Sequence, residues 1–157
     1  MWTLAQVKTA YQALSPAPAT LSAAATALNA QTTTQTVNVP LSAVAAYLGI
    51  GGTLGPVLAF AASPPSGASV ASIQAATGLA FMLQHAASFP AFDTTNPTVL
   101  ATLTGMLEAL VSPGTGITGP ITSTDQTNIL ALAQQTVPAW QPAVTAGDVQ
   151  TALALVA

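Results

Sequence analysis

Residues 31–40 read Gln-Thr-Thr-Thr-Gln-Thr-Val-Asn-Val-Pro, and they interrupt a chain whose remaining pattern is helical. β-Branched residues dominate this stretch, and polar and apolar side chains alternate from Thr36 to Val39. No other part of the sequence reads convincingly as a strand. Because one strand cannot build a sheet by itself, three interpretations stay open: the segment pairs with another chain, lies as an extended arm or linker, or packs as an irregular segment.

On both sides of this stretch, apolar residues recur at helical spacing in short runs that end at Pro or Gly. The clearest run begins at Asn96-Pro97, a cap followed by Pro at the first helical position. It carries a stripe formed by Leu100, Leu103, Leu107 and Leu110. A spacing of three and four residues places this stripe on one face, which we expect to pack into a core.

The longest predicted helix covers about residues 69–88, with several side chains available for burial: Val70, Ile73, Ala76, Ala80, Phe81 and Leu83. A further helix is expected to open with a capping box from Ser123 to Gln126 and to run to Val137. The last helix follows Thr145 and continues to Val156. Its Asp148, like Asp125 in the helix before it, lies in a first turn, where a carboxylate complements the helix dipole.

These patterns predict an all-α protein. The expected fold is a bundle of five to seven short helices with one extended β-like segment near residues 32–39. We expect a single helical domain over residues 1–157, with an extended segment at 31–40. Residues 1–18 are a possible N-terminal arm.

The charge content excludes several classes of function. Only 3% of the 157 residues are charged, against about 25% in a typical globular domain. Lys8 is the sole cation, whereas nucleic-acid binding requires several Lys or Arg to neutralise phosphates. The sequence therefore predicts no nucleic-acid partner. Because surface charge normally opposes association, it also predicts a protein that lies against other subunits.

No residue pattern points to an enzyme, a metal site or a cofactor. His85 is the one imidazole, and no nucleophile motif accompanies it. The four acidic residues show none of the short-range spacings that ligate metals, and there is no Cys. The glycine cluster at 49–55 lacks the Lys of a phosphate loop and reads as a helix–helix corner. We therefore expect no catalytic, cofactor-binding or metal-binding residue.

Residues 41–62 are uncharged and nominally long enough to cross a bilayer. Gly and Pro divide them into two short helical pieces, and no Lys or Arg flanks them. A membrane span is accordingly not favoured. A peripheral membrane module that uses this stretch remains an alternative, as does a helical surface-interaction module.

Several segments together resemble a known group of proteins. They are Leu28–Thr32, Val37–Leu48, Phe92–Val99, Leu107–Val111, Thr124–Gln126, Ala131–Ala133, Val137–Trp140 and Gly147–Val149. The chain from about residue 28 to residue 157 is similar to small proteins of the morphogenesis modules of tailed bacteriophages and prophages of high-GC bacteria. This chain differs from them in carrying Thr, Gln and Ala where their helices carry charges.

The resemblance implies a non-enzymatic structural component of a tailed phage particle, assembled in the bacterial cytoplasm and located in the virion. We expect a head-associated decoration or minor capsid protein, which would bind the major capsid protein, other virion proteins or copies of itself. The alternative location is the head–tail connector or the tail. In either place the chain would act through apolar contacts between subunits.

Two sets of residues are candidates for those contacts. Aromatic side chains dominate interface energetics, and each aromatic candidate has a competing interpretation as a core residue. The aromatic candidates are Trp2, Tyr47, Phe89, Phe92 and Trp140. The second set lies in the extended segment and is available for strand addition: Thr36, Val37 and Val39.

Overall fold

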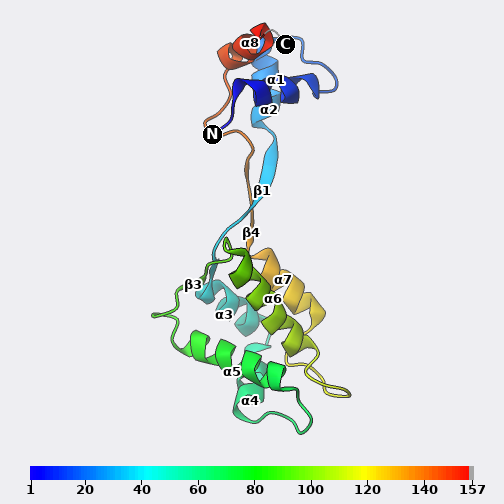
Figure 1. Ribbon diagram of the computed structural model, residues 1–157, viewed down its shortest axis with the longest axis vertical. Coiled ribbons are helices and arrows are strands. Elements are labelled where there is room, and N and C mark those ends of the chain that lie inside the picture. The colour runs from blue at the N-terminus through cyan, green and yellow to red at the C-terminus, as the bar shows by residue number, and fades with distance from the viewer. Residues whose placement is uncertain (156–157) are drawn as a thin grey trace. The chain divides into compact units, whose positions relative to one another are not determined.

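The computed structural model describes residues 1–155, which group into two compact units (Figure 1). The terminal unit comprises Met1–Gln35 together with the chain from Thr136 onward. The inserted unit is Thr36–Gln135. The terminal unit is thus assembled from both ends of the chain, whereas the inserted unit is continuous in sequence. What the sequence presents as one domain over residues 1–157 contains two separate hydrophobic clusters.

The expected all-α fold is wrong. Over residues 1–155 the chain forms eight helices and two small two-stranded sheets, with 55% helix and 9% strand. The content is mixed, and the helices exceed the expected five to seven. Both sheets involve the segment near residues 32–39, which was expected to stay unpaired within the chain.

The sequence pattern missed two strands. One is the two-residue β3 (Ala91–Phe92), and the other is β4, Gln134–Pro138. Strand β4 occupies the end of the helix that was predicted to reach Val137, and helix α7 covers only Ser123–Ala131. Thr136 and Val137 are β-branched, and Pro138 disfavours the helical conformation in the residue before it. These local preferences outweigh the helical spacing of the apolar residues.

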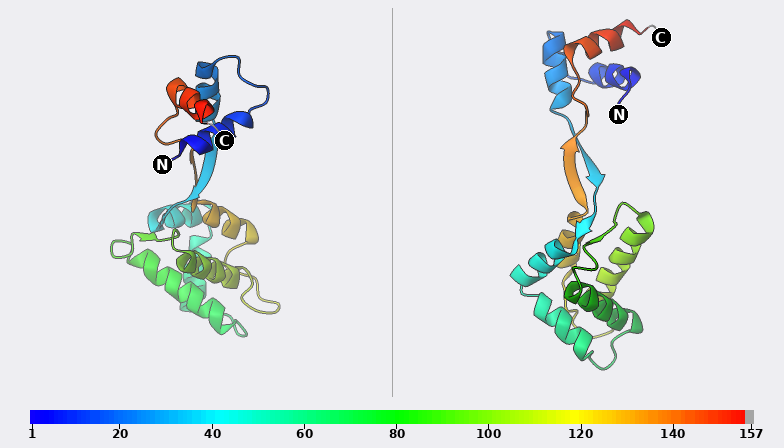
Figure 2. Two further views of the ribbon diagram at one scale, coloured as in Figure 1. Left: turned by 45° about the horizontal axis from the view of Figure 1, so that its top comes forward. Right: turned by 90° about the vertical axis from the view of Figure 1, so that its left-hand side faces the viewer.

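Strand β4 pairs with β1, Thr32–Thr36, so the extended segment finds its partner inside the chain (Figure 2). Backbone hydrogen bonds close both ends of this ribbon. The N–H of Ala139 donates to the carbonyl of Gln31 at 2.9 Å, and the N–H of Val37 donates to the carbonyl of Ala133 at 2.8 Å. All five residues of β1 are exposed. The ribbon carries both chain connections between the units.

The terminal unit contains α1 (Leu4–Gln12), α2 (Leu21–Asn29) and α8 (Ala146–Ala154). Helix α8 contacts both α1 and α2, and the buried side chains are small or aliphatic. They are Val7, Ala24, Ala25, Leu28, Val144, Val149 and Ala152. Val156, expected on the last helix, lies outside the described residues.

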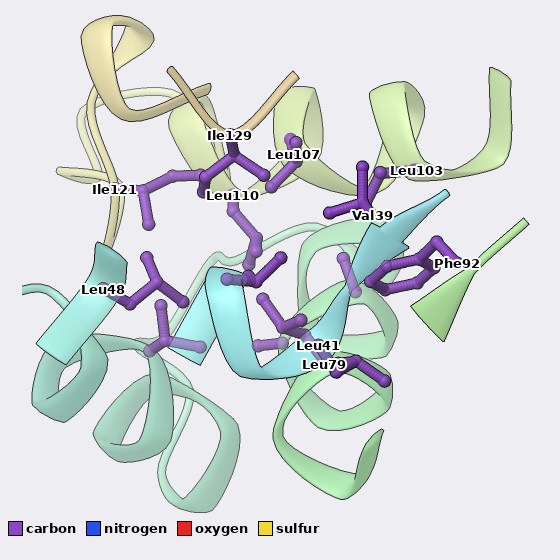
Figure 3. Packing of buried hydrophobic residues seen from close by; sticks show 14 of the residues in the cluster. Val39, Leu41, Leu48, Leu79, Phe92, Leu103, Leu107, Leu110, Ile121 and Ile129 are labelled. Atoms are coloured by element: carbon purple, nitrogen blue, oxygen red, sulfur yellow. The ribbon is translucent and has the colours of Figure 1, made fainter. Parts of the chain in front are cut away.

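The inserted unit contains α3 (Leu41–Ile50), α4 (Leu54–Ala62), α5 (Val70–Gln84), α6 (Pro97–Val111) and α7. A short antiparallel sheet joins β2 (Val39–Pro40) to β3 (Ala91–Phe92), with Val39 opposite Phe92. The predicted leucine stripe of α6 is confirmed, because Leu103, Leu107 and Leu110 are buried. Figure 3 shows them facing Val39, Leu41 and Leu48 across the core.

Helix caps follow the sequence closely. The side chain of Asn96 caps α6 and Pro97 opens the helix, as predicted. The last helix begins after Thr145 with Asp148 in its first turn, as predicted, and these two residues form a capping box. The box predicted to begin at Ser123 is wrong by one residue, because Thr122 is the cap of α7 and Asp125 supplies the acidic partner. Asp fulfils at this position the role that was assigned to Gln126.

Within residues 1–155 no single helix is long and apolar enough to cross a membrane. Helices α3 and α4 reach the required length and composition only as a pair, and they are bent by 102° at the break between them. Both helices bury side chains in the core of the inserted unit.

Candidate interaction site on the inserted unit

Helix α5 exposes an aromatic cluster near its C-terminal end. The side chain of Phe81 is 51% exposed and that of Phe89 is 42% exposed. The ring of His85 stacks on Phe81 with centroids 4.3 Å apart, and the ring of Phe89 meets Phe81 edge-on at 5.9 Å. Three rings that normally contribute to cores or interfaces therefore lie together at the surface.

The end of α5 explains why these rings meet. His85 is the C-cap residue, and its backbone carbonyl accepts hydrogen bonds from the N–H groups of Ser88 and Phe89, at 2.8 and 3.1 Å. This turn folds the chain back and places Phe89 beside Phe81, one turn before the cap. The Nδ1 atom of His85 lies 2.9 Å from the carbonyl oxygen of Phe81, which holds the imidazole over the phenyl ring.

Two grooves flank Phe81, which lines both of them. The groove between α5 and α6 has a volume of about 490 Å³ and is also lined by Ala71, Gln74, Ala75, Gly78, Met82, Gly105, Met106 and Ala109. The groove between α4 and α5 has a volume of about 460 Å³ and is also lined by Leu58, Ala61, Ala62, Thr77, Ala80 and Gln84. We call the aromatic cluster and these two grooves the Phe81 face.

Glycines hollow the first groove. A Cβ atom added at Gly105 would meet no atom within 4 Å, and one added at Gly78 would meet only the end of the Met106 side chain, at 3.7 Å. Met82 and Met106 have flexible thioether side chains that adapt to the shape of a partner. No charged side chain lines either groove, so the face is suited to an apolar and uncharged surface.

Among the carboxylates, Asp125 and Asp148 serve the helix starts. Burial raises the pKa of Asp125, but hydrogen bonds outweigh it, and the net result is a pKa below the usual 3.8. Its carboxylate accepts from the backbone N–H and hydroxyl of Thr122 and from the hydroxyl of Tyr47. The hydroxyl and N–H of Thr145 likewise lower the pKa of Asp148.

The predicted aromatic candidates are divided between the two units. Phe89 lies on the Phe81 face. Phe92 is buried on β3, and Tyr47 is partly buried against the same core while its hydroxyl binds Asp125. Trp2 and Trp140 lie in the terminal unit, with ring centroids 6.3 Å apart.

The predicted candidates from the extended segment face different surroundings. Thr36 is exposed at the end of β1. Val37 is partly buried, and its carbonyl accepts a hydrogen bond from the hydroxyl of Thr94. Val39 is fully buried on β2. Of the three residues, Thr36 alone presents an exposed side chain.

Phe81 and Val70 were expected to be buried, and this expectation is wrong. Val70 is 70% exposed at the start of α5. The buried residues of α5 are Ser72, Ala75, Ala76, Leu79 and Ala80. This stripe follows strict spacings of three and four, and Phe81 lies beside it rather than on it. Spacing alone did not separate the two faces of α5, because Val70, Ile73 and Phe81 also recur at helical spacing.

Comparison with known proteins gives no family: no protein-family model, no curated protein and no solved structure matches the chain. Within residues 1–155 no group of three or more His, Asp or Glu side chains gathers in a way that could hold a metal ion.

Proposed function

We propose that the protein is a non-enzymatic structural component of a tailed phage particle, which docks through the Phe81 face onto an apolar, uncharged surface of another virion protein. The observation that carries the proposal is the exposed aromatic cluster between two grooves without charged lining. The resemblance of residues 28–157 to morphogenesis-module proteins supports the particle as the setting. Within the particle we propose a head-associated role, as a decoration or minor capsid protein.

Burial of the Phe81 face would supply the binding energy. Burying the exposed half of the Phe81 side chain contributes roughly 2 kcal/mol, at about 25 cal/mol per Å² of apolar surface. Phe81 lines both grooves, so a partner that covers its ring also reaches the edge of each groove. Clustered anchors in such a central position carry most of the energy of typical interfaces.

The absence of charged side chains from the two grooves indicates that the partner surface is uncharged. No Lys, Asp or Glu lines either groove, and Lys8, the only cation of the chain, lies in the terminal unit. A nucleic acid or an acidic protein would leave its charges unpaired on this face. An apolar protein surface, including a neighbouring subunit of the capsid, matches it. Binding of this kind depends weakly on salt, because screening acts on charges.

Incorporation into particles tests the proposal. In the bacterial strain that encodes the chain, the gene is replaced by variants, particles are purified, and mass spectrometry measures the chain relative to the major capsid protein. We expect the unaltered chain at a fixed stoichiometry. Phe81→Gln and Gly105→Leu should each reduce incorporation by roughly ten-fold or more, which corresponds to about 1.4 kcal/mol.

The two variants alter the surface in opposite ways, so a loss of incorporation that both share points to docking rather than to a folding defect. Phe81→Gln removes an exposed ring, whereas Gly105→Leu fills a groove in which a new side chain meets open space. Val70→Gln is the matched control, because Val70 is exposed on the same helix but lines neither groove. Absence of the unaltered chain from particles contradicts the proposed location. Equal incorporation of all variants contradicts the Phe81 face.

A further inference from the structure

The terminal unit has an open pocket of its own, with a volume of about 490 Å³. All of its lining residues belong to this unit. Trp2 and Trp140, the two tryptophans of the chain, form part of the wall. Four lining side chains are polar and uncharged: Gln6, Thr33, Gln35 and Gln141. The other lining residues are Met1, Val137, Pro138 and Ala139. No charged side chain lines the pocket.

Both indoles are held in place by their own N–H groups. The Nε1 atom of Trp2 donates to the carbonyl of Pro142 at 2.5 Å, and that of Trp140 donates to the side-chain oxygen of Gln31 at 3.0 Å. The two rings meet edge-on with an interplanar angle of 68°. Because each N–H is already paired within the protein, the indoles present carbon surface to a ligand rather than hydrogen-bond donors.

The polar side chains around the indoles have hydrogen-bonding capacity to offer. Among residues 1–155, the side chains of Thr33, Gln35 and Gln141 form no hydrogen bond with the rest of the protein. Each amide offers two donors and an acceptor, and the hydroxyl of Thr33 can do both. A ligand that fits this pocket therefore combines an apolar ring face with several neutral groups that donate and accept.

We propose that the pocket is a binding site for a neutral carbohydrate, such as an oligosaccharide unit of an uncharged polysaccharide. A pyranose ring has a face of C–H groups, which suits the carbon surface of Trp2 and Trp140. Its hydroxyls both donate and accept, which matches the amides of Gln35 and Gln141. No charged side chain lines the pocket, which matches an uncharged sugar. This proposal is independent of the Phe81 face.

A proline-rich peptide is the other ligand class that aromatic pockets take. Polyproline recognition relies on aromatic grooves together with donors to the peptide carbonyls, since such a segment has no internal hydrogen bonds. In this pocket the free groups are the side chains of Thr33, Gln35 and Gln141, which accept as well as donate. A proline segment has no N–H to donate to these acceptors. Sugar hydroxyls donate and accept, so the mixed capacity of these side chains favours the sugar.

Tryptophan fluorescence gives a direct test, because both tryptophans of the full chain lie in the pocket. The chain is titrated separately with maltohexaose, cellohexaose, mannohexaose, galactohexaose and N-acetylchitohexaose, to about 10 mM each. Decaproline and heparin are titrated in parallel. We expect a saturable change in emission with at least one neutral sugar, at a dissociation constant of about 1 mM or below.

The double variant Gln35→Ala/Gln141→Ala should weaken the binding of that sugar by roughly ten-fold, the loss expected for two neutral hydrogen bonds. Gln150→Ala is the matched control, since Gln150 is an exposed glutamine of α8 outside the pocket. Both variants keep Trp2 and Trp140, so circular dichroism and the unliganded emission spectrum verify their folding. The proposal would be overturned if no sugar changes the emission, whether or not decaproline gives a saturable change. It would also be overturned if the double variant binds the sugar as tightly as the unaltered chain.

Discussion

Asp125 joins two helices of the inserted unit, α7 and α3, through one carboxylate. One oxygen accepts from the backbone N–H and hydroxyl of Thr122, and the other accepts from Tyr47 on α3. Asn128 donates to the same tyrosine hydroxyl at 2.9 Å. The carboxylate thus caps α7 and anchors α3 beside it. Its role is structural, in agreement with the expectation for the first turn of a helix.

We predict that Asp125→Asn destabilises the inserted unit at neutral pH by about 1 kcal/mol, the usual contribution of a capping interaction. The folded pKa of Asp125 lies below the unfolded value, so its contribution is complete above about pH 5. It is lost as pH falls through the folded pKa. Urea unfolding of both proteins should therefore show a difference at pH 7 that shrinks towards pH 2. Glu108→Gln, an exposed carboxylate on α6, serves as control. A difference that stays constant with pH would refute this role.

At the scale of the elements, the loop after α6 returns very close to the last turn of that helix. The backbone of Gly119 lies so close to the last turn of α6 that an added Cβ atom would overlap the carbonyl oxygens of Leu110 and Val111. The sequence marks this loop by its Gly and Pro content but does not show which glycine makes the close approach.

Gly119→Ala should accordingly destabilise the protein by roughly 2 kcal/mol, because the loop or the helix end must move. Gly49→Ala is the matched control within α3, where a new Cβ atom meets nothing within 4 Å. That substitution should stabilise the protein by about 0.5–1 kcal/mol, since alanine favours a helix interior. The urea midpoints of the two variants should move in opposite directions. Equal shifts would show that the close approach at Gly119 carries no cost.

Local sequence patterns are sufficient to predict some of these elements but not others. The leucine stripe and the cap of α6 follow from spacing and residue type alone, and the structure confirms both. The stretch 134–138 shows the opposite case. Its helical spacing continues from α7, but its backbone groups pair with β1, which lies about a hundred residues away in the sequence. Such a partner cannot be read from a local window.

At the scale of the whole molecule, the two units have separate cores, and the ends of the inserted unit meet. The N–H of Val37 and the carbonyl of Ala133 are hydrogen-bonded at 2.8 Å. We therefore predict that residues 36–135 fold when expressed alone, with cooperative thermal unfolding by circular dichroism and dispersed amide resonances. An unfolded fragment would show that the inserted unit depends on the terminal unit.

A substitution in the terminal unit provides the complementary measurement. Asn29 binds both backbone groups of Val144, with its side-chain amide donating to the carbonyl and accepting from the N–H, each at 2.8 Å. In the full chain, Asn29→Leu should lower the free energy of unfolding of the terminal unit by roughly 2 kcal/mol. The unfolding transition of the inserted unit should not move. A single transition that moves as a whole would contradict separate cores.

The sequence by itself determined the helical runs, most of their caps, the core-facing stripe of α6 and the neutral character of the surface, because these depend on local spacing and residue type. Tertiary structure alone decided the pairing of β1 with β4, the assembly of the terminal unit from both chain ends, and the convergence of Trp2 with Trp140. It also decided that Phe81 lies at the surface beside two grooves. The physical reason is the same in each case: long-range partners satisfy backbone and side-chain groups whose local preferences leave several conformations open.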